Sequence, residues 1–107
     1  MEEYLVSISN VNLYEFHDSS ALEEFAKYFQ KNGAKNYPQA EILLFVKTGE
    51  TSGISVSVYP NDEAREAAST TRDQKFNNKD FSHLVREISV LEGDVLTKHL
   101  LPHNIKD

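Results

Sequence analysis

Four histidines are the side chains of this 107-residue chain best suited to acid–base chemistry, because imidazole titrates near neutral pH. His17 stands just before the first predicted helix, and His83 just before the last predicted strand. Either could reach the edge of a cavity, so both are candidate catalytic residues. A solvent-exposed or helix-capping role would explain each of them more simply, because a lone histidine is a weak signal of a site.

The other two histidines, His99 and His103, are four residues apart. On a helix this spacing would place both on one face as metal ligands. Pro102 lies between them and disfavours a regular helix, and no pattern of ligating carboxylates accompanies them. We therefore expect no metal site and no cofactor.

The second predicted helix presents an almost all-alanine face, which either packs closely against the sheet or leaves a cavity. Five aromatic residues could line such a cavity: Tyr14, Phe25, Tyr59, Phe76 and Phe81. Arg72 and His83 would be the nearest polar groups, although Arg72 could instead pair with Asp73, Glu66 or solvent. A mostly apolar pocket with a few polar groups suits a small aromatic or lipid-like ligand.

Composition excludes several classes of function. The chain has no cysteine, which rules out disulfides and thiolate catalysis. Its net charge of −6 argues against binding of nucleic acid, which requires a basic stripe. No apolar run approaches the roughly 18 residues of a membrane span. The acidic N-terminus does not resemble a secretion signal, so we expect a cytoplasmic protein without membrane contact.

Three segments alternate with period two, the pattern of strands that are buried on one face. They are residues 4–9, 54–59 and 88–91, and in each of them Val or Ile takes one parity while polar residues recur on the other. We expect Val6, Ile8, Val56, Val58, Ile88 and Val90 to form the face that packs under the helices. The serines would then lie on the opposite face.

The order of elements follows from these strands and two amphipathic stretches. Strands are predicted at residues 4–10, continuing as far as 13, and at 41–47, 53–59 and 86–91. One helix follows residues 17–20 and ends near Gly33, with Ser20 and Glu23 at capping-box spacing. Asn61 or Asp62 caps the second helix, and residues 81–85 form a short helical turn.

The result is one α+β domain over residues 1–107, with the ferredoxin-like order β-α-β-β-α-β. Its antiparallel sheet carries both helices on one face. Residues 92–94 are predicted to turn the chain into a C-terminal tail.

The strand at residues 41–47 is apolar on both parities, which indicates cover on both faces. If Ile42, Leu44 and Val46 face the helices, Leu43 and Phe45 face outward. They would lie there beside Leu5, Tyr59 and Leu91. A second copy would cover this face under two-fold symmetry, which predicts a homodimer. The segment from Val95 to Leu101 folding back over it is the alternative.

The chain resembles the dimeric α+β barrel superfamily, near the antibiotic-biosynthesis-monooxygenase-like (ABM) domains. The resemblance spans residues 4–96. It rests on element order, on Val56-Ser57-Val58-Tyr59 before an alanine-rich helix with Thr71-Arg72-Asp73 and Phe76, and on Val90-Leu91-Glu92-Gly93-Asp94-Val95. It implies two sheets facing each other in a homodimer, with a ligand cavity in each protomer between helices and sheet.

Some members of this superfamily oxidise quinol-like or polyketide aromatics without metal or flavin, and others degrade haem. The haem-degrading members use a tryptophan on the second helix, where this chain has Ala67 and Ala68. The resemblance therefore implies a cofactor-independent monooxygenase acting on a small aromatic or quinol-like molecule. The alternative function is a non-enzymatic homodimer that binds a small ligand or another protein.

Overall fold

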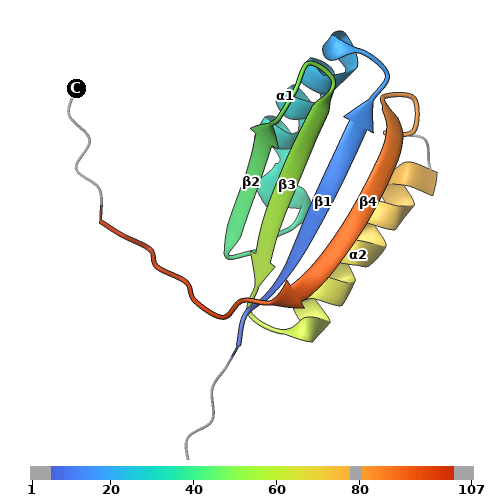
Figure 1. Cartoon of the computed structure of the whole chain (residues 1–107). Coiled ribbons are helices and arrows are strands. Elements are labelled where there is room, and N and C mark those ends of the chain that lie inside the picture. The colour runs from blue at the N-terminus through green and yellow to red at the C-terminus, as the bar shows by residue number, and fades with distance from the viewer. Residues whose placement is uncertain (1–5, 78–80, 103–107) are drawn as a thin grey trace, which may run out of the picture.

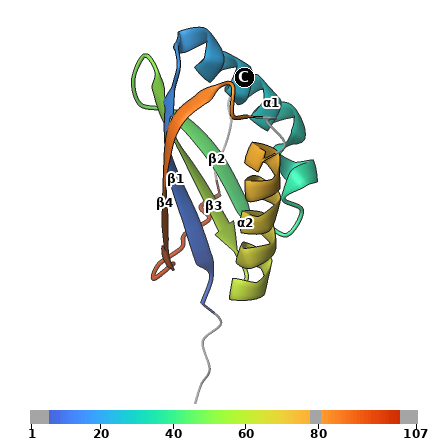
Figure 2. The same ribbon diagram turned by 90° about the vertical axis from the view of Figure 1, so that its right-hand side faces the viewer.

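The computed structural model describes residues 6–77 and 81–102. Its elements are β1 (Ile8–Phe16), α1 (Ser19–Asn36), β2 (Ile42–Lys47), β3 (Ser52–Tyr59), α2 (Asp62–Asn77) and β4 (Val85–Asp94). The four strands form one antiparallel sheet in the order β2-β3-β1-β4. Both helices cover the same face of this sheet (Figures 1 and 2). The predicted order β-α-β-β-α-β and the ferredoxin-like fold are confirmed.

Each helix begins at a side-chain cap. The Asp18 carboxylate accepts a hydrogen bond from the Ala21 backbone N–H at 2.8 Å, so Asp18 caps α1 and the predicted capping box at Ser20 is wrong. The Asn61 side chain accepts from the Ala64 N–H at 2.8 Å, and it caps α2 as predicted. Gly33 does not end α1, which continues to Asn36.

Two strands are displaced or longer than predicted. β1 begins at Ile8 and continues to Phe16, because it pairs along its length with both β3 and β4. β4 includes Gly93 and Asp94, which pair with Ser9 and Ile8 instead of forming a turn. Residues 81–84 form a turn, in which the Leu84 N–H donates to the Phe81 carbonyl at 2.8 Å. The predicted Tyr4 and Leu5 lie outside the described residues.

The face of β3 that contacts the helices is the opposite of the predicted one. Ser57 pairs with Asn10, and Tyr59 pairs with Ile8, so these residues share one face of the sheet. Ser55, Ser57 and Tyr59 are buried on that face, and Tyr59 packs against Ala64 and Ala68 of α2. Val56 pairs with Val11 on the far face. The prediction is correct for Ile88, which packs against the core, and wrong for Val56 and Val58.

The same correction applies to β2. Phe45 packs into the aromatic core, and Leu43 borders a cavity under the helices. Ile42, Leu44 and Val46 therefore point away from the helices, because strand side chains alternate. The expectation that Leu43, Phe45 and Tyr59 face outward is wrong. Leu43 and Phe45 pair with Ser57 and Ser55, which face the helices, and Tyr59 lies on the same face of β3.

The main core lies between α1 and the sheet and is largely aromatic. Phe16 is 1% exposed, Phe25 is 2% exposed, and their ring centroids are 5.3 Å apart. Phe25 also contacts Phe81 with centroids 5.0 Å apart, which joins the turn before β4 to the core. A smaller cluster of Tyr59, Ala64 and Ala68 lies under α2.

The face of the sheet that points away from the helices is apolar. Leu13, Leu44, Val46 and Leu91 are 40%, 51%, 48% and 58% exposed there. Residues 95–98 pass the ends of β1 and β2, where the Val95 N–H donates to the Ser7 carbonyl at 2.8 Å and Lys98 Nζ lies 2.9 Å from a Glu41 oxygen. The chain then extends away from the sheet (Figure 1). Leu96, Leu100 and Leu101 in this segment are 88%, 72% and 76% exposed, so the segment does not fold back over the sheet.

Among the described residues, neither helix has the length and apolar character that crossing a lipid bilayer requires.

Candidate functional site

A cavity lies between the helix-facing side of β1 and β3 and the two helices. Its polar wall comes from the strands and includes Asn10, Asn12, Tyr14, Ser55 and Ser57. Its aromatic wall includes Phe25, Tyr28, Phe29, Tyr37, Tyr59 and Phe81, and α2 contributes Ala68 and Arg72. The polar residues meet here because alternate residues of paired strands point to the same side.

The cavity is narrow. Its volume is about 30 Å³ when measured to the centre of a water-sized sphere, which is room for one or two water molecules. All space that protein atoms leave unfilled, including the mouth open to solvent, amounts to about 530 Å³. A molecule larger than water therefore enters only if a wall side chain moves.

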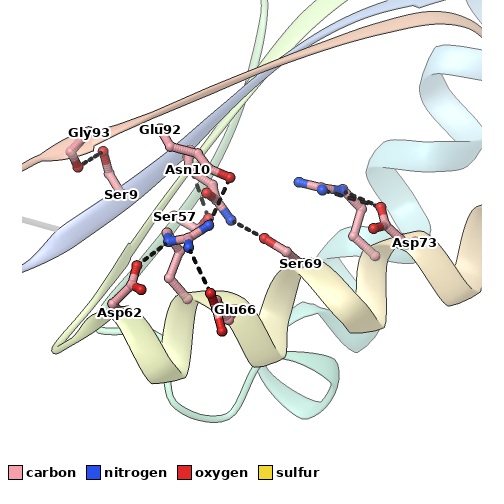
Figure 3. Close-up of polar contacts among 11 residues, drawn as sticks. Ser9, Asn10, Ser57, Asp62, Glu66, Ser69, Asp73, Glu92 and Gly93 are labelled. Atoms are coloured by element: carbon pink, nitrogen blue, oxygen red, sulfur yellow. Dashed lines mark hydrogen bonds and ion pairs between the residues drawn. The ribbon is translucent and has the colours of Figure 1, made fainter.

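Two asparagine oxygens on the cavity wall are buried without a hydrogen-bond partner. Asn10 donates through Nδ2 to the Ser69 hydroxyl at 3.2 Å, which links β1 to α2 (Figure 3). Asn12 donates through Nδ2 to the Tyr14 hydroxyl at 3.3 Å. The Oδ1 atoms of both residues accept from no described group. Buried polar atoms are nearly always paired, so these two are acceptors available to water or a ligand.

Tyr14 is placed to donate a proton into the cavity. Its hydroxyl oxygen accepts from Asn12 and, at 3.4 Å, from the Ser55 hydroxyl. Burial raises the pKa of Tyr14 above its ordinary value, and the two hydrogen bonds and the charge of Arg72 oppose this only partly. The phenol is therefore neutral near pH 7. With both acceptor positions engaged, its own proton remains free for another acceptor.

Arg72 supplies the positive charge of the site. Its side chain is 14% exposed, and its Nε and Nη2 atoms both donate to the Asp73 carboxylate at 3.2 Å (Figure 3). Its Nη1 atom is buried and has no hydrogen-bond partner among the residues that the structure describes. The cation also acts on the tyrosines, since it opposes the rise that burial causes in the pKa of Tyr37 and of Tyr59. The site thus combines one partly neutralised cation with several neutral hydroxyls.

The structure brings together five of the eight predicted site residues. Tyr14, Phe25, Tyr59, Phe81 and Arg72 all border the cavity. Phe76 packs on Phe81 with ring centroids 5.5 Å apart, but it borders a separate surface hollow. Arg72 pairs with Asp73, which is one of the alternatives that the sequence left open.

The two candidate histidines lie elsewhere. His17 and His83 are exposed, and neither borders the cavity. The Nε2 atom of His83 is 3.9 Å from a Glu24 carboxylate oxygen on α1. His99 is exposed in the C-terminal segment, and His103 is outside the described residues. Within residues 6–77 and 81–102, no three potential metal-ligating side chains gather in one place.

Sequence reasoning missed the polar half of the site. Asn12, Ser55, Ser57 and Tyr37 were not among the predicted residues, although all four border the cavity. The available signal was the alternation Asn10, Asn12, Tyr14, Phe16, which shows polar and aromatic residues on one parity of β1. The predicted end of that strand at residues 10–13 concealed this pattern.

Known proteins resemble this chain in fold rather than in sequence. No protein-family model matches it, and no curated protein matches it significantly. A dimeric ferredoxin-like protein from an uncultured marine organism aligns with a TM-score of 0.69 and 14% identity, over 91% of this chain and 94% of its own. A candidate antibiotic biosynthesis monooxygenase from Caulobacter crescentus CB15 aligns with a TM-score of 0.70 and 16% identity, over 88% and 93%.

A third solved structure is a monooxygenase from the gene ActVA-Orf6 of Streptomyces coelicolor, in complex with the ligand nanaomycin D. It aligns with a TM-score of 0.66 and 9% identity, over 92% of this chain and 94% of its own. These alignments cover nearly all of each chain at low identity, so they show a shared fold. The chain therefore has the ferredoxin-like α+β fold of the ABM-like proteins, as the resemblance in its sequence predicted.

Proposed function

We propose that the cavity binds a small planar aromatic molecule that carries phenol or quinol oxygens. The observation that supports this is the gathering of three unpartnered buried polar atoms on the wall of one aromatic-lined cavity. The Oδ1 atoms of Asn10 and Asn12 would accept from ligand hydroxyls. Nη1 of Arg72 would donate to a ligand oxygen, with a preference for a phenolate.

We further propose that the bound molecule is oxidised by molecular oxygen. The support is the shared fold with a monooxygenase solved in complex with the ligand nanaomycin D, together with the polar groups in this cavity. Arg72 would stabilise the ligand phenolate, which makes the ring electron-rich enough to react with O₂. At an activated CH₂ group the products balance as a carbonyl and one water, and the substrate supplies the electrons. Tyr14 would donate the proton that the departing oxygen needs.

The test is the binding and oxidation of 1,8-dihydroxyanthrone. Titration without oxygen measures binding, and oxygen consumption after mixing with air measures turnover. Arg72→Gln should weaken binding by about tenfold or more, because the charged hydrogen bond from Arg72 to the ligand oxygen is lost. Arg86→Gln, which removes an exposed arginine of β4, should change neither quantity. Equal binding by the wild type and Arg72→Gln would contradict the proposed site.

A non-enzymatic binding module remains the second candidate, because the two exposed histidines do not border the cavity. The same experiment separates the two functions. Binding that depends on Arg72 without oxygen consumption above the spontaneous rate would identify a binding module. Oxygen consumption that decreases together with ligand affinity in Arg72→Gln would identify an oxygenase.

We also propose that a second copy of the chain covers the apolar face of the sheet. Four aliphatic side chains between 40% and 58% exposed lie on this face, and exposed patches of this kind usually mark an interface. Proteins of the same fold are described as dimeric. Two sheets facing each other would form the dimeric α+β barrel that the sequence resemblance implies.

A further inference from the structure

A second hollow lies beside the cavity and is open to solvent. One wall is the small-residue face of α2, with Ala64, Ala67 and Thr71, and the other is the segment after α1 that includes Pro38 and Gln39. We call this hollow the alanine groove. Its volume is about 200 Å³ by the measure that gives about 30 Å³ for the cavity.

The groove and the cavity share a wall. Asn36, Tyr37, Tyr59 and Ala68 border both hollows. Tyr59 is 2% exposed and lies in a central strand, so its position is constrained by packing. Tyr37 is partly exposed and begins the connection from α1 to β2. Tyr37 is therefore less constrained than Tyr59, and a rotation of its ring would join the two hollows.

The two hollows differ in chemistry. The cavity carries the unpartnered oxygens of Asn10 and Asn12 and the free Nη1 of Arg72. The groove is bordered mainly by alanine, proline and the rings of Tyr37 and Tyr59. A molecule that occupies both the cavity and the groove would carry an oxygen-bearing ring and an apolar extension. The cavity alone has too little room for such a molecule, whereas the groove has several times more.

We propose that the alanine groove is a second part of the ligand site, and that it binds the apolar extension of a phenolic or quinol-like ligand. This inference rests on the proposed function, because it assigns the oxygen-bearing ring to the cavity. It adds Ala67 and Gln39 as residues that determine specificity by leaving the groove open. The extension is a hydrocarbon chain or a further fused ring, since both are apolar.

The test compares ligands that differ only in the extension. Titration calorimetry without oxygen measures the binding of resorcinol, which has no extension, and of 4-hexylresorcinol, which adds a six-carbon chain. Burial of part of the chain should make 4-hexylresorcinol bind about tenfold tighter or more. 1,8-Dihydroxyanthrone provides the fused-ring comparison. Whichever of 4-hexylresorcinol and 1,8-dihydroxyanthrone gains more affinity over resorcinol shows whether the groove prefers a hydrocarbon chain or a fused ring.

Two variants fill the groove from opposite walls. Ala67 and Gln39 are both exposed and border the groove but not the cavity, so Ala67→Trp and Gln39→Trp leave the core intact. Each should reduce the preference for 4-hexylresorcinol to about threefold or less, while the affinity for resorcinol stays within about twofold. Ala34→Trp is the control, because Ala34 is exposed on α1 and borders neither hollow.

The outcomes separate the two proposals. Resorcinol binding that Arg72→Gln abolishes, with no gain from the hexyl chain, would overturn the groove assignment and leave the proposed function intact. A gain that survives in both tryptophan variants, with folding verified by circular dichroism, would also overturn it. Failure of all three phenols to bind the wild type would overturn both proposals.

Discussion

The Asn12 side chain donates a hydrogen bond to the Tyr14 hydroxyl across 3.3 Å, two residues further along β1. Both residues face the helices, and the same hydroxyl accepts from Ser55 on β3. The hydrogen bond from Ser55 joins β3 to β1 on the polar wall of the cavity. Tyr14→Phe removes the shared acceptor and leaves two buried donors without a partner.

We expect Tyr14→Phe to lower the free energy of unfolding by about 1–3 kcal/mol, the usual cost of unsatisfied buried polar groups. Urea unfolding monitored by circular dichroism measures the change. Tyr28→Phe is the matched control, since the Tyr28 hydroxyl is part-buried and accepts from Asn36, where water can replace it. An equal loss in both variants would show that the cavity network has no special contribution.

Arg65 connects α2 to β4 through an ion pair. Its Nη1 atom lies 2.7 Å from a Glu92 oxygen, and its Nε atom lies 2.9 Å from Asp62. The Arg65 side chain is 10% exposed, but that of Glu92 is 48% exposed, so solvent screens the pair. A double-mutant cycle with Arg65→Gln and Glu92→Gln should give a coupling energy of about 1 kcal/mol or less. A coupling of several kcal/mol would contradict this assessment.

Stability should decrease in alkaline solution. Burial raises the pKa of Tyr14, Tyr37 and Tyr59 above the ordinary value of 10.0. A raised pKa means that the folded chain holds these protons more tightly than the unfolded chain. The stability that these three tyrosines contribute is therefore fully present below pH 10. It is lost as the pH rises through their raised pKa values.

Absorbance of the phenolate form measures this titration directly, and urea unfolding at several pH values measures the stability. In the folded protein Tyr14, Tyr37 and Tyr59 should ionise above the ordinary pKa of 10.0, since burial raises the pKa of each. Ionisation of Tyr14, Tyr37 and Tyr59 near the ordinary pKa of 10.0, with no loss of stability above it, would contradict the raised pKa values.

The apolar face of the sheet should control assembly. Leu44 is 51% exposed on this face, and a carboxylate there would be buried without a partner in a sheet-to-sheet dimer. Leu44→Asp should therefore shift the chain from dimer to monomer in sedimentation experiments. Gln30→Asp is the control, because it places the same charge on the exposed face of α1. A monomeric wild type would refute the proposed dimer.

Gly53 is required where β3 passes under the Phe45 ring. A Cβ atom at this position would lie 2.6 Å from Cζ of Phe45 and 3.2 Å from the Val46 carbonyl oxygen. Gly53→Ala forces the ring to shift and should cost about 1–3 kcal/mol of stability. Adding Phe45→Leu should recover part of this loss, because it removes the obstructing ring. Gly93→Ala is the control, since a Cβ there meets nothing within 4 Å.

The sequence was sufficient to predict the order of the elements. The period-two alternation marks β3 and β4, and the stripe of Leu22, Phe25 and Phe29 marks α1. These signals are local, because strand and helix periodicity depend only on neighbouring residues. The cap at Asn61 and the short connection between β2 and β3 are local in the same way.

The sequence was not sufficient to predict which face of each strand contacts the helices. Alternation separates two sets of side chains, but either set can face the helices until the register with neighbouring strands is known. Here Ser57 lies opposite Asn10, and Tyr59 lies under the alanines of α2. Aromatic rings fill much of the space below the helices, and Leu13, Leu44, Val46 and Leu91 remain exposed on the open face.

The candidate site shows the same division between local and tertiary information. Sequence alone determined an α+β chain with a small-residue face on its second helix and with aromatic residues able to line a pocket. Only the tertiary structure placed Asn12, Ser55 and Ser57 on one cavity and left the two candidate histidines on the surface. The physical reason is that the site forms between elements distant in sequence, so strand register and helix packing decide which polar groups are buried together.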